Sequence, residues 1–426
     1  SGHFLVAAFL MLVPMRSKLE GISIDKAIDS VLSENIHGLE IDQRCIEIAA
    51  FSLAFTAWKY PGSTGFRVLP ELNLACSGLP LNTKMKNWTK LAGENQTLKY
   101  IMESLYNKFS DAPILGSLID FSDNFEEQNL FHNDWEKARR ILTSEQFNSY
   151  DYEKNEFEIS AKGVSQAANL LLQKYDLVAT NYPFIGIRKQ NAILKKYCED
   201  RHKEAKHDLS TCLIERCSKL LKTNGTMAFV SPHNWYFLGA YRAFRENLLK
   251  EKRWNMIALL GSRSFQTPMY DFGITLTIFS NDNKFDDNLI SGITVEDYNT
   301  PDEKANALKN DQISVINQLH QLKNPDQRVT LEVRSEIPLL QENGTCLTGA
   351  MNGDSPKFIR KYWEFDICPE KWVFLQSTVT TNTFYSGRDQ LIYYDVENGH
   401  LREDPYIRRE KLHNSDERGK LLWGKN

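Results

Sequence analysis

Asp176-Leu-Val-Ala-Thr-Asn-Tyr-Pro-Phe184 is the stretch that decides the fold of this chain. The apolar run 176–180 predicts a buried strand, and the strand ends in a polar, kinked loop that continues into Ile185-Gly186. An Asn amide beside an aromatic ring, placed where a strand ends, is suited to holding a planar amino group. We therefore predict a binding site for a planar amine at Asn181.

The chemistry of such a site follows from its hydrogen-bond acceptors. The side-chain oxygen of Asn181 and the backbone carbonyl of Tyr182 can accept two hydrogen bonds from an exocyclic NH2 group, while Phe184 stacks on the base. An aromatic amine is a poor nucleophile until its lone pair is localised in this way, so the loop indicates methylation of an amine. Methylation of a cytosine carbon requires a thiolate nucleophile, and the chain contains no Pro-Cys dipeptide.

The composition is that of a soluble globular protein. The chain has 426 residues, of which 42% are hydrophobic and 25% are charged, and this length predicts two or three domains. The formal net charge of -4 gives no global nucleic-acid signature, so any contact with DNA must come from local basic patches.

The cysteines and the apolar start of the chain predict a cytoplasmic protein without a membrane segment. Seven cysteines without a CxxC pair indicate reduced thiols rather than a disulfide framework. The apolar run Phe4–Met15 is too short to span a bilayer and lacks the basic start of a signal peptide, so we expect a buried helix there.

The order of elements predicts an α/β fold with a Rossmann-like, doubly wound and mostly parallel sheet. Predicted strands at 37–42, 176–180, 226–231 and 255–260 alternate with helices, and residues 272–279 complete a hairpin-like pair that predicts an antiparallel edge strand. The expected helices are 43–60, capped by Asp42, 208–222, closed by Asn224-Gly225, and 241–250.

The composition changes twice along the chain, and this predicts its domain organisation. Residues 1–285 are expected to form one domain, in which 63–150 is an insertion with helical stretches near 98–109 and 133–142. Residues 286–330 are expected to form a connector with one helix-like segment at 303–322. Residues 331–426 contain short strands, aromatics and mixed charge, which predict an incomplete α+β region.

Three residues are candidates for binding a nucleotide-like cofactor. Glu40 lies at the end of a predicted strand, where a Rossmann-like sheet places an acid that accepts hydrogen bonds from ribose hydroxyls. Taken alone, it fits a surface or cap residue better, and the cofactor role gains support from Gly2 upstream and Asn181 downstream. Gly2 opens the first helix and belongs either to a tag or to a nucleotide-binding loop. Asp120 could contact an adenine ring of the cofactor or be a plain turn residue.

Two further segments are candidates for contacting a nucleic acid. The basic stretch 188–207, which begins with Arg188 and Lys189, would follow a phosphate backbone or form a solvated helix face. Trp235 follows a strand at the same edge of the sheet as Asn181; it would stack on a splayed base, at roughly 1–3 kcal/mol, or pack in the core. The chain contains no motif that predicts a metal site.

Taken in order, these residues resemble the adenine-specific DNA methyltransferases of the gamma group, and most closely the PglX-like enzymes of BREX phage-defence systems and the type IIG restriction–modification proteins. The segments that carry the resemblance are Ser-Gly-His-Phe-Leu at 1–5, His-Gly-Leu-Glu-Ile-Asp at 37–42, Ala-Ala-Phe at 49–51, 176–186, 208–280, Thr348-Gly349 and 358–364. The resemblance covers most of the chain and matches 63–150 and 375–426 only loosely.

The resemblance implies a site-specific DNA adenine N6-methyltransferase that uses S-adenosylmethionine and acts on double-stranded DNA with a flipped adenine, with other defence-system subunits as further partners. Asn181, Pro183 and Phe184 would be catalytic, and Gly2 and Glu40 would touch the cofactor. Tyr182 stands where these enzymes usually have a proline. The strand and the acid that open their cofactor loop are expected before Ser1, so we expect the chain to be a fragment that is inactive or weakly binding alone.

Two rival functions remain open from the sequence. A catalytically degenerate DNA-binding subunit of a defence complex would also explain Tyr182. Methylation of a protein glutamine or an RNA amine would use the same loop, since any planar NH2 group fits it; the region after 331 argues against this third function.

Overall fold

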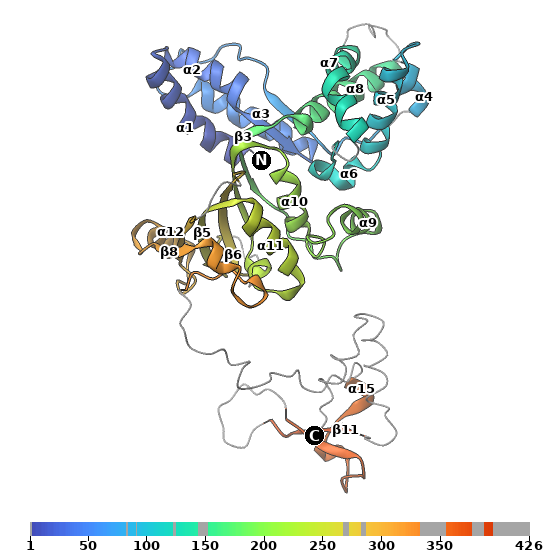
Figure 1. Cartoon of the computed structure of the whole chain (residues 1–426), viewed down its shortest axis with the longest axis vertical. Helices are drawn as coiled ribbons and strands as arrows, with labels where there is room; N and C mark the ends of the chain where they lie inside the picture. The colour runs from blue at the N-terminus through green and yellow to red at the C-terminus, as the bar shows by residue number, and fades with distance from the viewer. Residues whose placement is uncertain are drawn as a thin grey trace. The chain divides into compact units, whose positions relative to one another are not determined.

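The computed structural model of the chain describes residues 2–81, 84–90, 92–121, 125–143, 152–266, 272–282, 287–332, 355–376 and 387–394. The chain divides into two compact units, residues 1–333 and 334–426 (Figure 1).

The first unit begins with helices and one short parallel strand pair. Its elements up to the start of the larger sheet are α1 (His3–Glu20), α2 (Ile24–Ser30), the π-helix η1 (Val31–Asn35), β1 (His37–Glu40), α3 (Gln43–Trp58), β2 (Asn73–Cys76), α4 (Met85–Lys90), α5 (Gln96–Phe109), α6 (Ala112–Leu115), the 3-10 helix η2 (Gly116–Leu118), α7 (Phe125–Thr143) and α8 (Tyr152–Leu172).

The rest of this unit forms a six-stranded sheet with its helices. The elements are β3 (Tyr175–Asn181), α9 (Ala192–Arg201), α10 (Leu209–Ser218), β4 (Leu221–Pro232), η4 (His233–Tyr236), η5 (Gly239–Tyr241), α11 (Arg242–Glu251), β5 (Arg253–Gly261), β6 (Ile274–Ser280), β7 (Leu289–Thr294), α12 (Pro301–Asn310), β8 (Ser314–Asn317), α13 (Gln318–Gln321) and η6 (Pro325–Gln327).

The sheet is mixed, and this corrects the prediction of a mostly parallel one. The strand order is β3-β4-β6-β5-β7-β8; β3 pairs with β4 and β5 pairs with β7 in parallel, whereas β6 is antiparallel to both of its neighbours and β8 is antiparallel to β7. The antiparallel strand expected at the edge, β6, is therefore interior. The chain returns from β5 to β6 without an intervening described helix, so β6 runs back beside β5 and fills the place between β5 and β4.

Apolar side chains cover both faces of this sheet, as expected for an α/β protein. On one face Phe229 and Phe279 join the large core with residues of α10 and α11. On the other face Val230, Ala258 and Ile293 pack against Ala307 of α12. The α/β class predicted from the sequence is confirmed at this level.

The strands β1 and β2 form a separate parallel pair. Leu74 of β2 packs on one side with residues of α1, α2 and α3, and Ala75 packs on the other side in the large core. The predicted cap of α3 is confirmed, because the Asp42 carboxylate accepts a hydrogen bond from the Arg44 amide.

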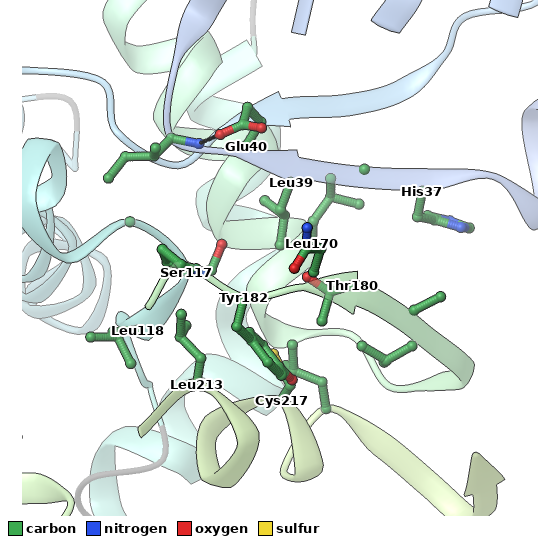
Figure 2. A pocket seen from close by; sticks show the side chains of 18 of the residues that line it. His37, Leu39, Glu40, Ser117, Leu118, Leu170, Thr180, Tyr182, Leu213 and Cys217 are labelled. Atoms are coloured by element: carbon green, nitrogen blue, oxygen red, sulfur yellow. Dashed lines mark hydrogen bonds between the residues drawn. The ribbon is translucent and has the colours of Figure 1, made fainter. Parts of the chain in front are cut away.

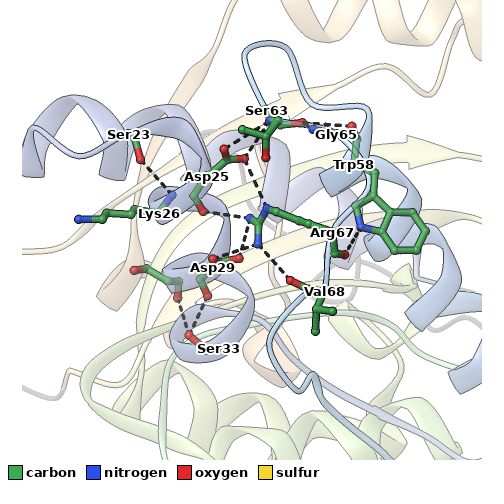
Figure 3. A network of polar contacts seen from close by, with 12 residues as sticks. Ser23, Asp25, Lys26, Asp29, Ser33, Trp58, Ser63, Gly65, Arg67 and Val68 are labelled. Carbon is green, nitrogen blue, oxygen red and sulfur yellow. Dashed lines mark hydrogen bonds and ion pairs between the residues drawn. The ribbon is translucent and has the colours of Figure 1, made fainter.

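A polar network fixes the loop that connects α3 to β2 (Figure 3). The Arg67 guanidinium forms an ion pair with Asp29 of α2 at 2.7 Å and donates to the Asp25 carbonyl at 3.2 Å. The Trp58 indole donates to the Arg67 carbonyl at 2.9 Å. These contacts hold the long loop against α2 and thereby set the path into β2.

Helices dominate the segment between β2 and β3, as predicted for the insertion. Helices α4, α5, α7 and α8 lie together in Figure 1, and the Trp135 indole of α7 donates to Asn169 of α8 at 3.2 Å. Helix α5 begins at an Asn95 cap and buries Leu98, Ile101, Met102, Leu105 and Phe109.

Two local predictions were wrong. Asn224-Gly225 does not close a helix: α10 ends at Ser218, and Asn224, with φ 64°, lies within β4, whose register against β3 shifts there. The segment 303–322 is not one helix, because β8 follows α12 and extends the main sheet. In both places a local pattern was outweighed by strand pairing.

The second unit contains α15 (Ser355–Phe358), β9 (Ile359–Lys361), η7 (Tyr362–Glu364), β10 (Trp372–Leu375) and β11 (Gln390–Tyr393). Its strands form an antiparallel sheet in the order β10-β11-β9. Phe358 and Ile392 are buried together. Thr348 and Gly349 lie outside the described residues.

Candidate functional site

The predicted amine-binding loop begins at the last residue of β3. Asn181 pairs in register with Val230 of β4, so the loop leaves the sheet beside the end of a second parallel strand. Asn181 and Pro183 are exposed, whereas Tyr182 between them is only 4% exposed. The side chains of this loop therefore alternate between solvent and the core.

Beyond Pro183 the loop is tied to the rest of the sheet. The half-buried Phe184 packs beside the cluster that contains Val230 and Ala258. The Ile185 carbonyl accepts a hydrogen bond from the Leu209 amide at 3.0 Å, and Gly186 forms an isolated bridge with Asp208. The loop is thus fixed at both ends.

A cavity of about 600 Å³ lies between β1 and β3 (Figure 2). Its walls are residues 37–41 of the β1 segment and Tyr175 with 177–183 of the β3 segment, and its other lining residues are Asn35, 114–118, Leu170, Leu209, Leu213, Cys217 and Leu220. The Asn181 loop therefore opens onto the cavity.

The edges of β1 and β3 that face this cavity carry no strand partner among the described residues. There, β1 pairs with β2 and β3 pairs with β4. His37 begins β1 and Tyr175 begins β3, and their rings meet at 5.4 Å, so the two strands start side by side. Glu40 and Asn181, which end the strands, both line the cavity, which indicates that the strands run in the same direction.

Glu40 occupies the position predicted for it. It is the last residue of β1 and lines the cavity. Its Oε1 accepts a hydrogen bond from the Ile41 amide at 2.8 Å. That bond leaves Oε2 as an acceptor for a ligand hydroxyl.

Gly2 begins α1 with a left-handed backbone, φ 80°. A Cβ at this position would lie 2.9 Å from the Cα of Ala49, so α1 and α3 approach each other closely here. The first turn of α1 also reaches β1, because a Cβ on Gly38 would lie 3.0 Å from Leu5. Gly2 is not among the residues that line the cavity.

Asp120 is engaged in the protein interior. Its carboxylate pairs with the Lys219 ammonium at 3.1 Å and lies 4.0 Å from the Arg216 guanidinium. Arg216 is itself buried and donates to the Ile119 carbonyl at 2.8 Å. This setting favours a structural role for Asp120 over contact with a cofactor.

Asp208 caps α10. Its Oδ1 accepts hydrogen bonds from the Ser210 amide at 2.9 Å and the Ser210 hydroxyl at 2.7 Å. Burial raises the pKa of this carboxyl above its ordinary value.

The candidate nucleic-acid contacts differ in their exposure. Arg188 and Lys189 are exposed directly after the Asn181 loop and form no ion pair with a described residue. Trp235 is fully buried, and its indole donates to Ser231 at 3.0 Å. Burial favours the core-packing alternative for Trp235, since neither ring face is free to stack on a base.

One side of the cavity, formed by α10, was not predicted from the sequence. Leu209, Leu213 and Cys217 line it from α10, and they recur every four residues along one helix face. This periodicity could have identified a helix face turned toward the site.

Two further features bear on the class of site. In the described ranges, His, Cys, Asp and Glu side chains form no group of three that could hold a metal ion. None of the described helices combines the length and apolar character needed to cross a bilayer.

Comparison with known proteins identifies related sequences. Residues 34–265 match the model of the Eco57I restriction-modification methylase family. The adenine-specific methyltransferase PglX of Lacticaseibacillus casei (strain Zhang) is 26% identical over 268 residues, and BrxX of Escherichia coli O9:H4 (strain HS), also an adenine-specific methyltransferase, is 27% identical over 289 residues. Each match covers 62% of this chain but only 22% of PglX and 23% of BrxX.

Among solved structures, the chain is similar to the ATP-dependent Type ISP restriction-modification enzyme LlaBIII bound to DNA. The TM-score is 0.44 with 12% sequence identity, and the match covers 74% of this chain and 19% of LlaBIII.

Proposed function

The chain belongs to the Eco57I restriction-modification methylase family, and from this premise we propose that it is the core of a site-specific DNA adenine N6-methyltransferase that uses S-adenosylmethionine in restriction–modification or phage defence. The observation that carries the proposal is the exposed Asn181 at the end of β3, beside the half-buried Phe184. The curated relatives are adenine-specific methyltransferases, which supports adenine as the target.

The proposed reaction uses the acceptors of the loop to localise the lone pair of the amine. The Asn181 side-chain oxygen and the Tyr182 carbonyl accept hydrogen bonds from the adenine amino group, and Phe184 stacks on the flipped base. The bound cofactor supplies a methyl group on a sulfonium. Asn181 and the Tyr182 carbonyl would hold the amine nitrogen with its lone pair free to accept that methyl group, and the nitrogen would then lose its extra proton to water.

The residues at the end of β1 fit the proposed cofactor. The free oxygen of Glu40 suits ribose hydroxyls, and the left-handed Gly2 lets the chain enter α1 next to β1. Asp120 does not fit, because its carboxylate is already paired with Lys219.

We further propose that the cavity between β1 and β3 takes a strand that joins the two sheets and leads into the cofactor loop. An unpaired strand edge is a template for pairing with a further strand, and the facing edges of β1 and β3 have no partner among the described strands. Residues 1–285 then belong to one methyltransferase domain that also includes β7 and β8 of the same sheet, with the second unit opening a target-recognition region. As part of the same proposal, the whole protein methylates DNA, lies in the cytoplasm and has other defence-system subunits as partners.

The test is detection of methylated adenine by sequencing in cells that express the complete gene, with wild type compared with Asn181→Ala. Wild type is expected to leave marks at one sequence motif, and Asn181→Ala is expected to leave none. Asn191→Ala is the matched control, because Asn191 caps α9 nearby on the chain and its loss costs only about 1 kcal/mol of stability. Equal marks in wild type and Asn181→Ala would remove Asn181 from its role.

The degenerate-subunit alternative is motivated by Tyr182 in place of the usual proline. Calorimetric titration of S-adenosylmethionine into the complete protein separates the two functions. Binding supports the enzyme, whereas DNA binding without cofactor binding supports the degenerate subunit. Parallel methyl-transfer assays on duplex DNA, RNA and protein address the third function.

A further inference from the structure

We propose that the side chain of Tyr182 is a positioning residue, a buried anchor that holds Asn181 facing outward in place of the usual proline. Three consecutive residues differ sharply in exposure, because Asn181 and Pro183 are exposed while Tyr182 is 4% exposed. The consequence for catalysis rests on the function proposed above, whereas the anchoring itself does not.

The Tyr182 ring connects β3 to two other elements. Its hydroxyl donates to the Met227 thioether of β4 at 3.5 Å, and its ring lies 5.6 Å from that of Phe229 on the same strand. The hydroxyl also meets the buried Cys217 thiol of α10. Figure 2 shows the ring directed toward Cys217, away from Glu40.

The anchor also keeps its hydroxyl protonated. Burial raises the pKa of Tyr182 well above its ordinary value, so the hydroxyl is a neutral donor at neutral pH. It can therefore donate to the Met227 thioether under these conditions.

Because Tyr182 follows Asn181 in an extended segment, the burial of the Tyr182 ring also sets the direction of the Asn181 side chain. Successive side chains of an extended segment point to opposite faces, so burying residue 182 on one side turns residue 181 to the other. A slip of one residue would exchange the two faces. The Tyr182 amide hydrogen bond to the Val230 carbonyl is long, 3.4 Å, and resists such a slip only weakly; the buried ring supplies the restraint.

The usual proline at this position would restrain the same backbone differently. A proline fixes φ through its ring and removes the amide hydrogen, whereas Tyr182 fixes the position of its Cα through contacts with Met227, Phe229 and Cys217. Pro183 already restricts the backbone of Tyr182, the residue before it, and Ile185 is tied to Leu209. The loop between these restraints is short, so one packed ring is enough to orient it.

The first experiment measures order in the loop without reference to activity. Hydrogen–deuterium exchange is followed in the peptide 177–187 of the complete protein for wild type, Tyr182→Phe and Tyr182→Ala. Tyr182→Phe is expected to exchange like wild type, because the packed ring remains. Tyr182→Ala is expected to exchange about tenfold faster in this peptide, which corresponds to 1.4 kcal/mol in the opening equilibrium.

Tyr175→Ala is the matched control on the same strand. Tyr175 begins β3, and its hydroxyl donates to the Leu170 carbonyl at 2.7 Å. This variant is expected to lower the melting temperature like Tyr182→Ala but to leave exchange at residues 182–187 unchanged. Equal acceleration of the loop in both variants would show a general loss of stability and overturn the proposal.

The second experiment measures methyl transfer. Tyr182→Ala is expected to lower kcat by about 100-fold, the effect of misplacing a reacting group by about 1 Å, with the KM for the cofactor unchanged and recovery in Tyr182→Phe. Tyr182→Pro supplies the other restraint, a fixed φ, and we expect it to recover part of the kcat that Tyr182→Ala loses. Wild-type kcat in Tyr182→Ala would overturn the anchoring role.

The two experiments separate this inference from the proposed function. If no version of the protein methylates DNA, the proposed function fails while the exchange result still decides whether Tyr182 anchors the loop. If wild type methylates and exchange in Tyr182→Ala equals that of wild type, the inference alone fails.

Discussion

Arg245 is the residue that most clearly shows how a single buried side chain organises this protein. It is fully buried on α11, and its guanidinium donates to the carbonyls of Trp235 and Leu238 at 2.7 Å each and to that of Gln327 at 3.1 Å. Asp326 provides a fourth carbonyl at 2.5 Å. Arg245 therefore joins the segment that follows β4 to the last turn of the first unit.

The Arg245 contacts predict a large effect of its removal. Arg245→Met is expected to lower the free energy of unfolding by roughly 3 kcal/mol or more, because each buried carbonyl left without a donor costs about 1–3 kcal/mol. Urea denaturation of the first unit measures this change.

Arg242 provides the matched control for that measurement. It lies on the same helix, is exposed, and donates to the Gln327 side chain. Arg242→Met is expected to change stability by less than about 0.5 kcal/mol. Equal losses in the two variants would contradict the role assigned to Arg245.

At the scale of elements, the pair β1 and β3 contains a contact that depends on pH. The rings of His37 and Tyr175 meet where the two strands begin. Burial lowers the pKa of His37 below its ordinary value of 6.5, so the unfolded chain binds a proton more readily than the folded one. The stability contributed by neutral His37 is complete above pH 6.5 and is lost as the pH falls through the lowered value of the folded state.

His37→Phe is therefore expected to reduce the loss of stability between pH 7 and pH 5, because phenylalanine keeps the ring contact and cannot be protonated. Burial also lowers the pKa of His207, so in the His37→Phe variant the stability still falls to some extent as the pH is lowered. Thermal unfolding as a function of pH measures both contributions. An unchanged slope in the double variant His37→Phe/His207→Phe would contradict this account.

The sequence predicted elements well where a local signal and the tertiary structure agree. The apolar run before Asn181 and the Asp42 cap both predicted observed elements. The sequence failed where strand pairing decides the outcome: Asn224-Gly225 has the composition of a helix stop but bends β4. Segment 303–322 has helical composition, yet residues 314–317 complete the sheet as β8.

The candidate site was predictable only in part, for a related reason. Asn181 and Glu40 were identified because strand ends in an α/β sheet carry function, and both line the cavity. The inward direction of Tyr182 and the burial of Trp235 depend on neighbours from β4, α10 and α11. Such neighbours are distant in the sequence, so residue type alone could not reveal them.

At the scale of the whole molecule, the net charge of -4 makes local basic residues decisive for the proposed DNA binding. Arg188 and Lys189 are exposed directly after the Asn181 loop. Replacing both with alanine is expected to weaken binding of the complete protein to any duplex. The plot of the logarithm of the DNA-binding constant against the logarithm of the salt concentration should become less steep by about 1.8, at about 0.9 per phosphate contact.

Fluorescence anisotropy between 50 and 200 mM salt, a range over which phosphate contacts dominate affinity, measures that slope. Lys18→Ala combined with Lys90→Ala removes the same charge from α1 and α4, where both lysines are exposed, and is expected to leave the slope unchanged. Equal slopes for the Arg188/Lys189 variant and wild type would show that the backbone of DNA is held elsewhere.

The facing edges of β1 and β3 have a practical consequence for anyone who works with this polypeptide. If a strand fills the cavity, as proposed, it pairs with both edges by β-augmentation. A short synthetic peptide of extended, apolar sequence, supplied in trans, would compete for the same edges. Without such a complement, the same open edges invite unwanted self-association, and solubilising fusion partners would be needed during purification.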